Sequence, residues 1–547
     1  MEKTKLQDSL LMGALASSFG IFLSKLLGLF YYSPLSDLAG EANMAFYSIA
    51  YTYYDLLLQI SSAGIPFAIA SLVAKYMAKK DYKTVLLIKK LGTSVVLALS
   101  VFIGFIFILT ASPLAKQSLS ASAPQEDIIA LKNLFYILTV AIVTVPFLSS
   151  VRGYVQGLKR LDIYGASQVL EQFVRVFSII IGAYIYVRVL HFDSMWAIYV
   201  AIAAASLGAI VAIVFTKYFS IKDEKHVYEL AKQQDYDASR TTKEVVNEIL
   251  SIGIPFLIIS FLGTAGPLIN TTFFMDYMTK VNGPQIYAEA KLASGILQAN
   301  IAKISNIPSV IALGFGSGMV PYLSEALEKQ DNHQITRYIN QILDTVCIIL
   351  VPIIAIFAFF AKDIYFIMYG NSNLELGASL FAISCIQIFL GTIAPVFSSI
   401  MMSLKLRKNA IVTLVLCFII KVVTFFPLVK RFGTVGMIYS SALYYLTQIL
   451  MYFYFIRVNF NVNIWGASKR FVLITLSSII MVIPPFIIHN LIPFNYTDRI
   501  YDIFIMAGLG IIMLFNYYWV TKKLGLLAKI FELKEVSVMK ILKRYRS

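Results

Sequence analysis

Six ionisable side chains lie inside apolar segments that are long enough to cross a membrane. They are Lys25, Asp55, Glu171, Arg175, Lys303 and Lys421. A charge at the centre of a bilayer costs roughly 2.5–3.5 kcal/mol on insertion scales, so such residues face a protein interior or a water-filled cavity and mark paths for charged substrates. The chemistry they predict is the binding or transfer of a charged group, and it depends on the helices that hold them.

Lys25 and Lys303 form the first candidate site, a pair of ammonium groups suited to an anion such as a phosphate. Lys25 falls in the outer half of the first apolar segment, and Lys303 falls in the outer half of the eighth. If the chain repeats after six spans, the two lysines approach each other from opposite halves at similar depth. The alternative for each lysine is snorkelling, in which the stem carries the charge to the lipid headgroups.

The other intramembrane charges each allow a functional and a structural interpretation. Asp55 either pairs with a lysine, binds a coupling cation or carries a proton, or it is a buried, neutral, hydrogen-bonded carboxyl. Glu171 and Arg175 are four residues apart and can form an ion pair on one helix face. Lys421 has no partner on its own helix, which favours a cavity, and Arg152 opens the basic segment after the fourth span. The candidate cavity charges or structural charges are therefore Glu171, Arg175, Lys421 and Arg152.

The composition is that of a polytopic membrane protein. The chain has 547 residues, 59% of them hydrophobic and 14% charged, whereas about a quarter of the residues of a soluble domain are charged. A span needs about 20 apolar residues, and we count fourteen segments of this kind. They lie near 10–32, 44–72, 91–113, 131–152, 164–188, 194–218, 246–273, 295–321, 340–361, 377–403, 409–428, 434–457, 470–490 and 500–521.

The net charge of +16 fits basic cytoplasmic loops better than a nucleic-acid partner. With the N-terminus inside, about 33 Lys and Arg fall in inside segments and about 8 in outside loops. One span more or fewer would reverse this asymmetry for every later loop. We therefore predict an even number of spans and both termini in the cytoplasm. The first segment is expected to be retained as a span, because no small-residue cleavage site follows it.

Two short, similar segments indicate an internal repeat. "VPFLSS" (145–150) and "APVFSS" (394–399) are each followed by a basic turn and another span, at an offset of six spans. Parallel six-span halves of this kind bind substrate between them. The basic tail either lies on an anionic leaflet as a surface helix or is solvated. The predicted divisions are an N-lobe (1–220), an inter-lobe loop (221–245), a C-lobe (246–458), an extra helix pair (459–521) and the tail (522–547).

The eighth segment holds three alternating glycines, Gly314, Gly316 and Gly318, and then a proline. Small residues permit a flexible gate or simply close helix packing. The chain lacks a phosphate-binding G-x-x-x-x-G-K-[ST] loop, an H-E-x-x-H motif and a Cys/His cluster, so we expect no ATPase, no metal site and no cofactor. An ion or the membrane potential remains as an energy source. The three cysteines lie in apolar runs and are expected to be packing residues.

Four stretches resemble a known family. "FLSKLLGL", "SSAGIPFAIASLVAKY", "RGYVQGLKRLDIYGASQVLEQFVRV" and "GFGSGMVPYLSEAL" are similar to polysaccharide exporters of the MOP superfamily, which includes MATE transporters, and most of all to the MurJ (MviN-type, YtgP-like) lipid II flippases. The resemblance implies an all-α membrane fold of two six-helix lobes around a central cationic cavity, with an added helix pair that shapes a groove for an undecaprenyl tail. It also implies transport of a lipid-linked peptidoglycan precursor by alternating access, in the service of cell-wall synthesis and cell shape.

The resemblance also assigns residues. Lys25 matches a basic residue of the family's S-R-x-L-G motif, and Lys303 matches a basic residue in the eighth span. A further arginine of the family falls on Tyr31, and its basic pair in the second span falls on Leu58 and Gln59. These departures leave fewer cavity cations than the family pattern has. The residues expected to line the diphosphate site are Lys25, Lys303, Asp55, Gln59 and Tyr31.

Alternative functions remain open on the sequence. One is export of another lipid-linked oligosaccharide, such as a teichoic acid, capsule or O-unit. A drug or cation antiporter would favour acidic cavity residues, whereas basic ones prevail here. A membrane glycosyltransferase would need a carboxylate or metal cluster at one membrane face, which the sequence does not supply. The expected partners are lipid II, membrane lipids and the cell-wall synthesis machinery, for a monomer in the plasma membrane.

Overall fold

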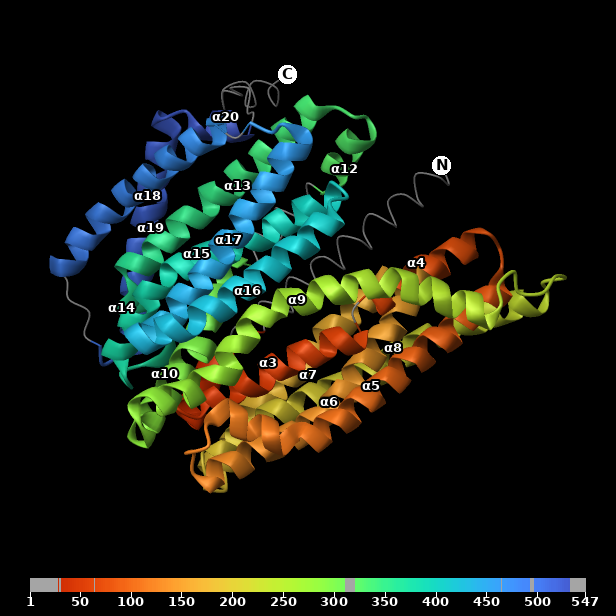
Figure 1. Cartoon of the computed structure of the whole chain (residues 1–547), viewed down its shortest axis with the longest axis horizontal. Coiled ribbons are helices and arrows are strands. Elements are labelled where there is room, and N and C mark those ends of the chain that lie inside the picture. Colours follow the sequence, from red (N-terminus) through yellow and green to blue (C-terminus); the bar gives the residue numbers. More distant parts are fainter. Residues whose placement is uncertain are drawn as a thin grey trace, which may run out of the picture. The chain divides into compact units, whose positions relative to one another are not determined.

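The computed structural model describes residue 28 and residues 31–62, 64–309, 320–463, 465–491 and 496–531. Throughout these ranges the regular structure is helical and contains no strand (Figure 1). The predicted all-α membrane fold is therefore confirmed.

Eleven helices among the described residues are long and apolar enough to cross a membrane. The predicted span 434–457 is also helical, as α17 (Thr434–Phe460), but its many tyrosines and serines make it less apolar. The predicted span 10–32 lies almost wholly outside the described residues, and the span 295–321 does so in part. The number fourteen thus stays a prediction.

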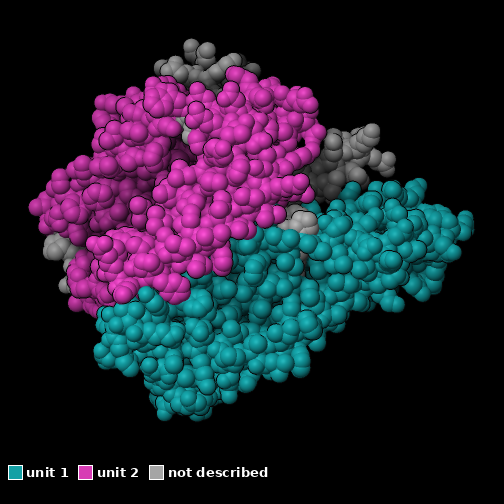
Figure 2. All heavy atoms as spheres, in the orientation of Figure 1, with its two compact units in different colours: residues 1–300 teal, residues 301–547 magenta. Residues whose placement is uncertain are grey.

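The chain forms two compact units, residues 1–300 and 301–547, which Figure 2 distinguishes by colour. These two units do not test whether the chain consists of two repeated six-span lobes, so the lobes stay a prediction. The helices of the first unit are α2 (Tyr32–Ala39), α3 (Met44–Ser62), α4 (Ile65–Ala78), α5 (Tyr82–Leu119), α6 (Gln125–Gly157), α7 (Leu161–Tyr184), α8 (Met195–Lys232), α9 (Thr242–Asn282) and α10 (Tyr287–Ser294). The first unit also contains a 3-10 turn, η2 (Pro284–Ile286), and a π-helical segment, η1 (Ile185–Val189), and a second π-helical segment, η3 (Gly295–Ile301), crosses the boundary between the units.

Close contact between neighbouring helices organises the first unit. α5 lies along α6, α6 along α8, and α7 along α8 (Figure 1). Two glycines of the "RGYVQG" stretch let α6 touch α4: a Cβ on Gly153 would lie 2.5 Å from the carbonyl oxygen of Pro66, and one on Gly157 would lie 2.6 Å from Val73. Only a residue without a side chain permits such an approach. These glycines thus fix the packing of α6, which carries Arg152.

The second unit is a separate helical bundle. Its core gathers buried side chains such as Ile339, Val346, Phe397 and Tyr452. The predicted extra pair is present as two long helices, α18 and α19, which pack through Met481, Leu509 and their neighbours, while the lipid-tail groove stays a prediction. The helices are α12 (Val320–Glu328), α13 (Asn332–Phe359), α14 (Ala361–Tyr369), α15 (Leu374–Ser403), α16 (Arg407–Phe432), α17, α18 (Trp465–Leu491), α19 (Arg499–Lys523) and α20 (Leu526–Phe531).

The connection between α8 and α9 is shorter than the sequence indicates, because α8 continues to Lys232. Asp81 fastens this connection to the start of α5. Its carboxylate caps α5 by accepting from the Thr84 N–H at 3.1 Å, and it also accepts from the side chain of Gln234 at 3.1 Å and from the Ser239 N–H at 3.1 Å. Burial raises the pKa of Asp81, but these hydrogen bonds outweigh it and lower the pKa to about 2.

Candidate functional site

A buried network of three charges joins α6 and α7 in the first unit. The two carboxylate oxygens of Glu171 accept from Arg152 at 2.7 Å and from Arg175 at 2.6 Å. The three side chains are only 9%, 12% and 15% exposed, in the order Arg152, Glu171, Arg175. The ion pair expected from the four-residue spacing forms, and Arg152 joins it from the neighbouring helix. Two guanidinium groups against one carboxylate leave an excess of one positive charge inside the bundle.

Hydroxyl groups hold this charge network to α8. The Nε of Arg152 donates to Ser167 at 3.0 Å, and the Ser167 hydroxyl is 2.8 Å from that of Thr216. Gly208 lets α8 approach closely, since a Cβ there would lie 2.8 Å from the carbonyl oxygen of Glu171. The "RGYVQG…SQVLEQFVRV" stretch therefore encodes one packed polar junction of three helices.

The junction retains unused donors. Among the residues that the structure describes, Nη2 of Arg152 and Nε of Arg175 are buried and have no hydrogen-bond acceptor. A buried donor without an acceptor costs about 1–3 kcal/mol, and a surplus of cationic donors is an arrangement that an anionic group can satisfy. The network therefore combines a structural role with the capacity to attract an anion.

Tyrosines of α3 form a cluster that the sequence analysis missed. The Tyr31 and Tyr47 hydroxyls are 2.6 Å apart, and the rings of Tyr47, Tyr51 and Tyr54 follow one another at 4.4 and 5.7 Å. Arg175 acts electrostatically on Tyr31 and Tyr54, which places its charge close to the cluster. The signal was available, because Tyr47, Tyr51 and Tyr54 have the i, i+4, i+7 spacing of one helix face.

The predicted diphosphate site is described only in part. Lys25 lies outside the described residues, as do Gly314, Gly316 and Gly318. Lys303 is half-buried in the helical turns that follow η3 and belongs to the second unit. The convergence of the two lysines and the flexible gate therefore stay predictions.

The remaining members of the predicted set lie in the first unit. Tyr31 is buried and bonded to Tyr47, as described above. Asp55 is exposed on α3, and Gln59 follows one turn later, half-buried. Asp55 acts electrostatically on Tyr31 and Tyr54, so a carboxylate also borders the tyrosine cluster. The structure thus associates Tyr31 and Asp55 with the neighbourhood of Arg175.

Lys421 occupies a packed interface between α16 and α17. It is 1% exposed and donates to the hydroxyls of Ser440 at 2.6 Å and Ser441 at 2.8 Å. Its ammonium also lies 5.4 Å from the centre of the Phe425 ring, a favourable cation–π distance. This is a structural position, one of the two alternatives that the sequence allowed for Lys421.

The cysteines and the possible metal ligands of the described residues were also candidates for chemistry. Cys347, Cys385 and Cys417 are buried free thiols within apolar helices, as expected of packing residues. In the described part of the chain, three or more His, Cys, Asp or Glu side chains nowhere come together as a metal would require.

The helical fold of the chain is similar to the folds of solved membrane transporters. An inward-facing multidrug resistance MATE family transporter aligns with a TM-score of 0.63 at 14% identity, over 82% of this chain and 96% of its own. The lipid II flippase MurJ in an inward closed conformation aligns with a TM-score of 0.63 at 14% identity, over 93% and 99% of the two chains.

Sequence comparison supplies the family. The family model described as polysaccharide biosynthesis protein matches residues 10–327, and the chain belongs to this family. It is 28% identical over 484 residues to the lipid II flippase MurJ of Bacillus subtilis (strain 168), covering 87% of this chain and 88% of the relative. It is 23% identical over 382 residues to the stage V sporulation protein B of the same organism, covering 69% of each. The resemblance drawn from the sequence motifs is thus confirmed.

Proposed function

We propose that this protein is a flippase that moves the undecaprenyl-diphosphate-linked peptidoglycan precursor lipid II from the inner to the outer leaflet. The observation that carries the proposal is the buried excess of positive charge at Arg152, Glu171 and Arg175, in a chain similar to a lipid II flippase along most of its length. A cation exporter would need the opposite surplus, since acids and not guanidinium groups attract its substrate.

The proposed mechanism is alternating access through a cationic cavity. The diphosphate meets Lys25 and Lys303, the sugar–peptide head occupies hydrated space, and the lipid tail stays in the bilayer beside α18 and α19. Without such a cavity, a charged head would face hydrocarbon, where an unpaired charge is prohibitive. The polar head therefore crosses inside the protein while the apolar tail crosses outside it.

The return step needs an energy source. One elementary charge that crosses 100 mV gains about 2.3 kcal/mol, which is enough to favour one orientation by tens of fold. Asp55, exposed on α3 beside the tyrosine cluster, is the carboxylate we propose to bind a coupling cation or a proton. The protein would act in the plasma membrane as a monomer with both termini in the cytoplasm, and would deliver precursor to the cell-wall synthesis machinery.

A second candidate function is export of another lipid-linked oligosaccharide, such as a teichoic acid, capsule or O-unit. It is favoured by the departures from the flippase pattern at Tyr31, Leu58 and Gln59, where the family has basic residues. Fewer cations suit a head group with less negative charge. The family description, polysaccharide biosynthesis, accommodates both functions.

A leaflet-resolved lipid II assay in cells depleted of the protein distinguishes the two. We expect lipid II to accumulate on the inner leaflet, and expression of the Lys25→Ala/Lys303→Ala double variant to leave it there at normal protein levels. The matched control is Lys280→Ala/Lys329→Ala, since both side chains are about 60% exposed or more, and this variant should restore flipping. Normal lipid II flipping with loss of another surface polymer would instead establish the second candidate, and full activity of the Lys25/Lys303 double variant would refute the cationic cavity.

A further inference from the structure

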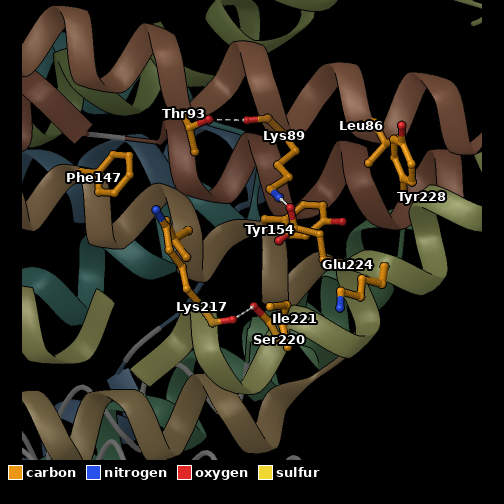
Figure 3. A pocket seen from close by; sticks show the side chains of 12 residues that line it. Leu86, Lys89, Thr93, Phe147, Tyr154, Lys217, Ser220, Ile221, Glu224 and Tyr228 are labelled. Carbon is orange, nitrogen blue, oxygen red and sulfur yellow. Dashed lines mark hydrogen bonds and ion pairs between the residues drawn. The ribbon is translucent and has the colours of Figure 1, made fainter. Parts of the chain in front are cut away.

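A cavity with a mostly apolar wall that also carries several charged side chains lies within the first unit, between α5, α6 and α8 (Figure 3). Its volume is about 540 Å³, large enough for a phosphate-bearing head group. Ile221 and Tyr228 on its rim are about half exposed, so the cavity opens at the surface of the unit. Every residue that lines it belongs to residues 1–300.

The cavity carries a surplus of positive charge. Three lysines, Lys89, Lys217 and Lys225, line it together with a single carboxylate, Glu224. Lys89 forms an ion pair with Glu224. Lys217 has no ion pair among the described residues, and its ammonium lies 5.1 Å from the centre of the Phe147 ring. In Figure 3, Lys89 from α5 and Lys217 from α8 extend into the cavity from opposite walls.

The cavity also offers an unused neutral donor. Tyr154 on α6 is 2% exposed, and its hydroxyl has no hydrogen-bond partner among the described residues. The Lys89 ammonium lies 5.0 Å from the centre of the same ring. This buried hydroxyl lacks the acceptor that buried polar groups normally have, and an oxygen-rich anion would supply one.

The apolar sequence of the helices sets the depth of the cavity. No charged residue occurs in 195–216 of α8, and Lys217 follows directly; no charged residue occurs in 91–115 of α5, and Lys89 and Lys90 precede it. Both lysines therefore lie where the hydrocarbon ends. On α8, Val214 and Tyr218 at this boundary are 64% and 71% exposed, as side chains that face lipid are. This end of the helices is the basic one, which the positive-inside rule assigns to the cytoplasm.

We propose that this cavity binds the phosphate of an anionic phospholipid of the inner leaflet. The phosphate accepts from the Lys217 ammonium and the Tyr154 hydroxyl, and the acyl chains run along the exposed apolar face of α8. Basic pockets between membrane helices on the cytoplasmic side bind anionic head groups in this manner. A lipid fits better than a soluble phosphate because the site continues directly into lipid-facing surface. The site is independent of the proposed flippase activity.

Native mass spectrometry of the full-length protein in detergent tests the site by titration with phosphatidylglycerol against phosphatidylcholine. The wild type should retain phosphatidylglycerol preferentially. Lys217→Ala should bind it about fivefold more weakly, since one basic residue near an anionic surface is worth about 1 kcal/mol, and Lys217→Arg should bind it as the wild type does. Tyr154→Phe should weaken binding without any change of charge.

The matched control is Lys222→Ala, which removes the same charge from an exposed position of α8 that does not line the cavity; its binding should be unchanged. Apparent melting temperatures measured without added lipid establish that each variant is folded. If Lys217→Ala does not fold, Lys217→Arg and Tyr154→Phe still test the site. Equal retention of the two lipids, equal weakening by Lys222→Ala, or displacement of the lipid by an excess of inorganic phosphate would each overturn the proposal.

Discussion

Glu171 is the residue on which the polar junction of the first unit depends. Both of its oxygens are engaged by guanidinium groups, one from its own helix and one from α6. Removal of one member of a buried ion pair costs far more than the pair contributes, because the partner charge stays buried without compensation. Removal of the Glu171 carboxylate would leave two buried arginines, Arg152 and Arg175, without their counter-charge.

We therefore predict that Glu171→Ala destabilises the protein by about 3–5 kcal/mol and that its apparent melting temperature in detergent falls accordingly. The control is Glu325→Ala, which breaks the exposed Glu325–Lys329 pair and should leave the melting temperature almost unchanged. Equal melting temperatures for the two variants would show that the junction contributes no stability.

The candidate site could be predicted from the sequence only where partners are close along the chain. The four-residue spacing of Glu171 and Arg175 sufficed for their ion pair. Arg152 joins them from α6, the helix that precedes α7, a contact that local spacing does not encode. Likewise Lys421 finds its acceptors, Ser440 and Ser441, on the next helix, so the sequence alone could not decide between a cavity and a structural position.

At the scale of elements, hydropathy located the helices but not their ends. The predicted span 194–218 became α8, which continues to Lys232. Hydropathy falls where the bilayer ends, but the backbone hydrogen bonds of a helix can continue beyond that point. Residues 217–232 contain no proline or glycine that would stop the helix. The same reason explains the overhang of α5 before residue 91. Membrane depth could be predicted, and helix length could not.

Asp81 ties the α8–α9 connection to α5, and its stabilising effect should depend on pH. Because its pKa is lowered from 3.8 to about 2, the carboxylate contributes up to about 2 kcal/mol. This contribution is complete above pH 3.8 and is lost as the pH falls towards 2. Asp81→Asn should therefore melt at a lower temperature than the wild type at pH 6, and the difference should shrink between pH 4 and pH 2.

Melting temperatures measured across this pH range check the prediction. Asp235→Asn is the control, because Asp235 is exposed in the same connection and its replacement should leave the profile of the wild type. A constant difference between Asp81→Asn and the wild type at every pH would contradict the role assigned to the Asp81 charge.

For the whole molecule, the distribution of basic residues predicts an orientation. The connection between α8 and α9 should face the cytoplasm, and the turn between α5 and α6 should face the outside. The three native cysteines are buried, so cysteines introduced at exposed positions report without background. A membrane-impermeant maleimide should label Ser122→Cys in intact cells and Asp237→Cys only after permeabilisation. The reverse labelling pattern would contradict the predicted orientation, because every loop would then lie on the opposite side of the membrane.

The overhang of α8 also governs how the first unit rests in its membrane. Ion pairs from Asp223 to Arg160 and from Glu224 to Lys89 fasten the overhang to neighbouring helices. These contacts link the overhang of α8 to α5 and to the start of α7, so a change in hydrocarbon thickness acts on these three helix ends together. A thicker hydrocarbon layer would therefore bring acyl chains nearer to Lys89 and Lys217 at the same time.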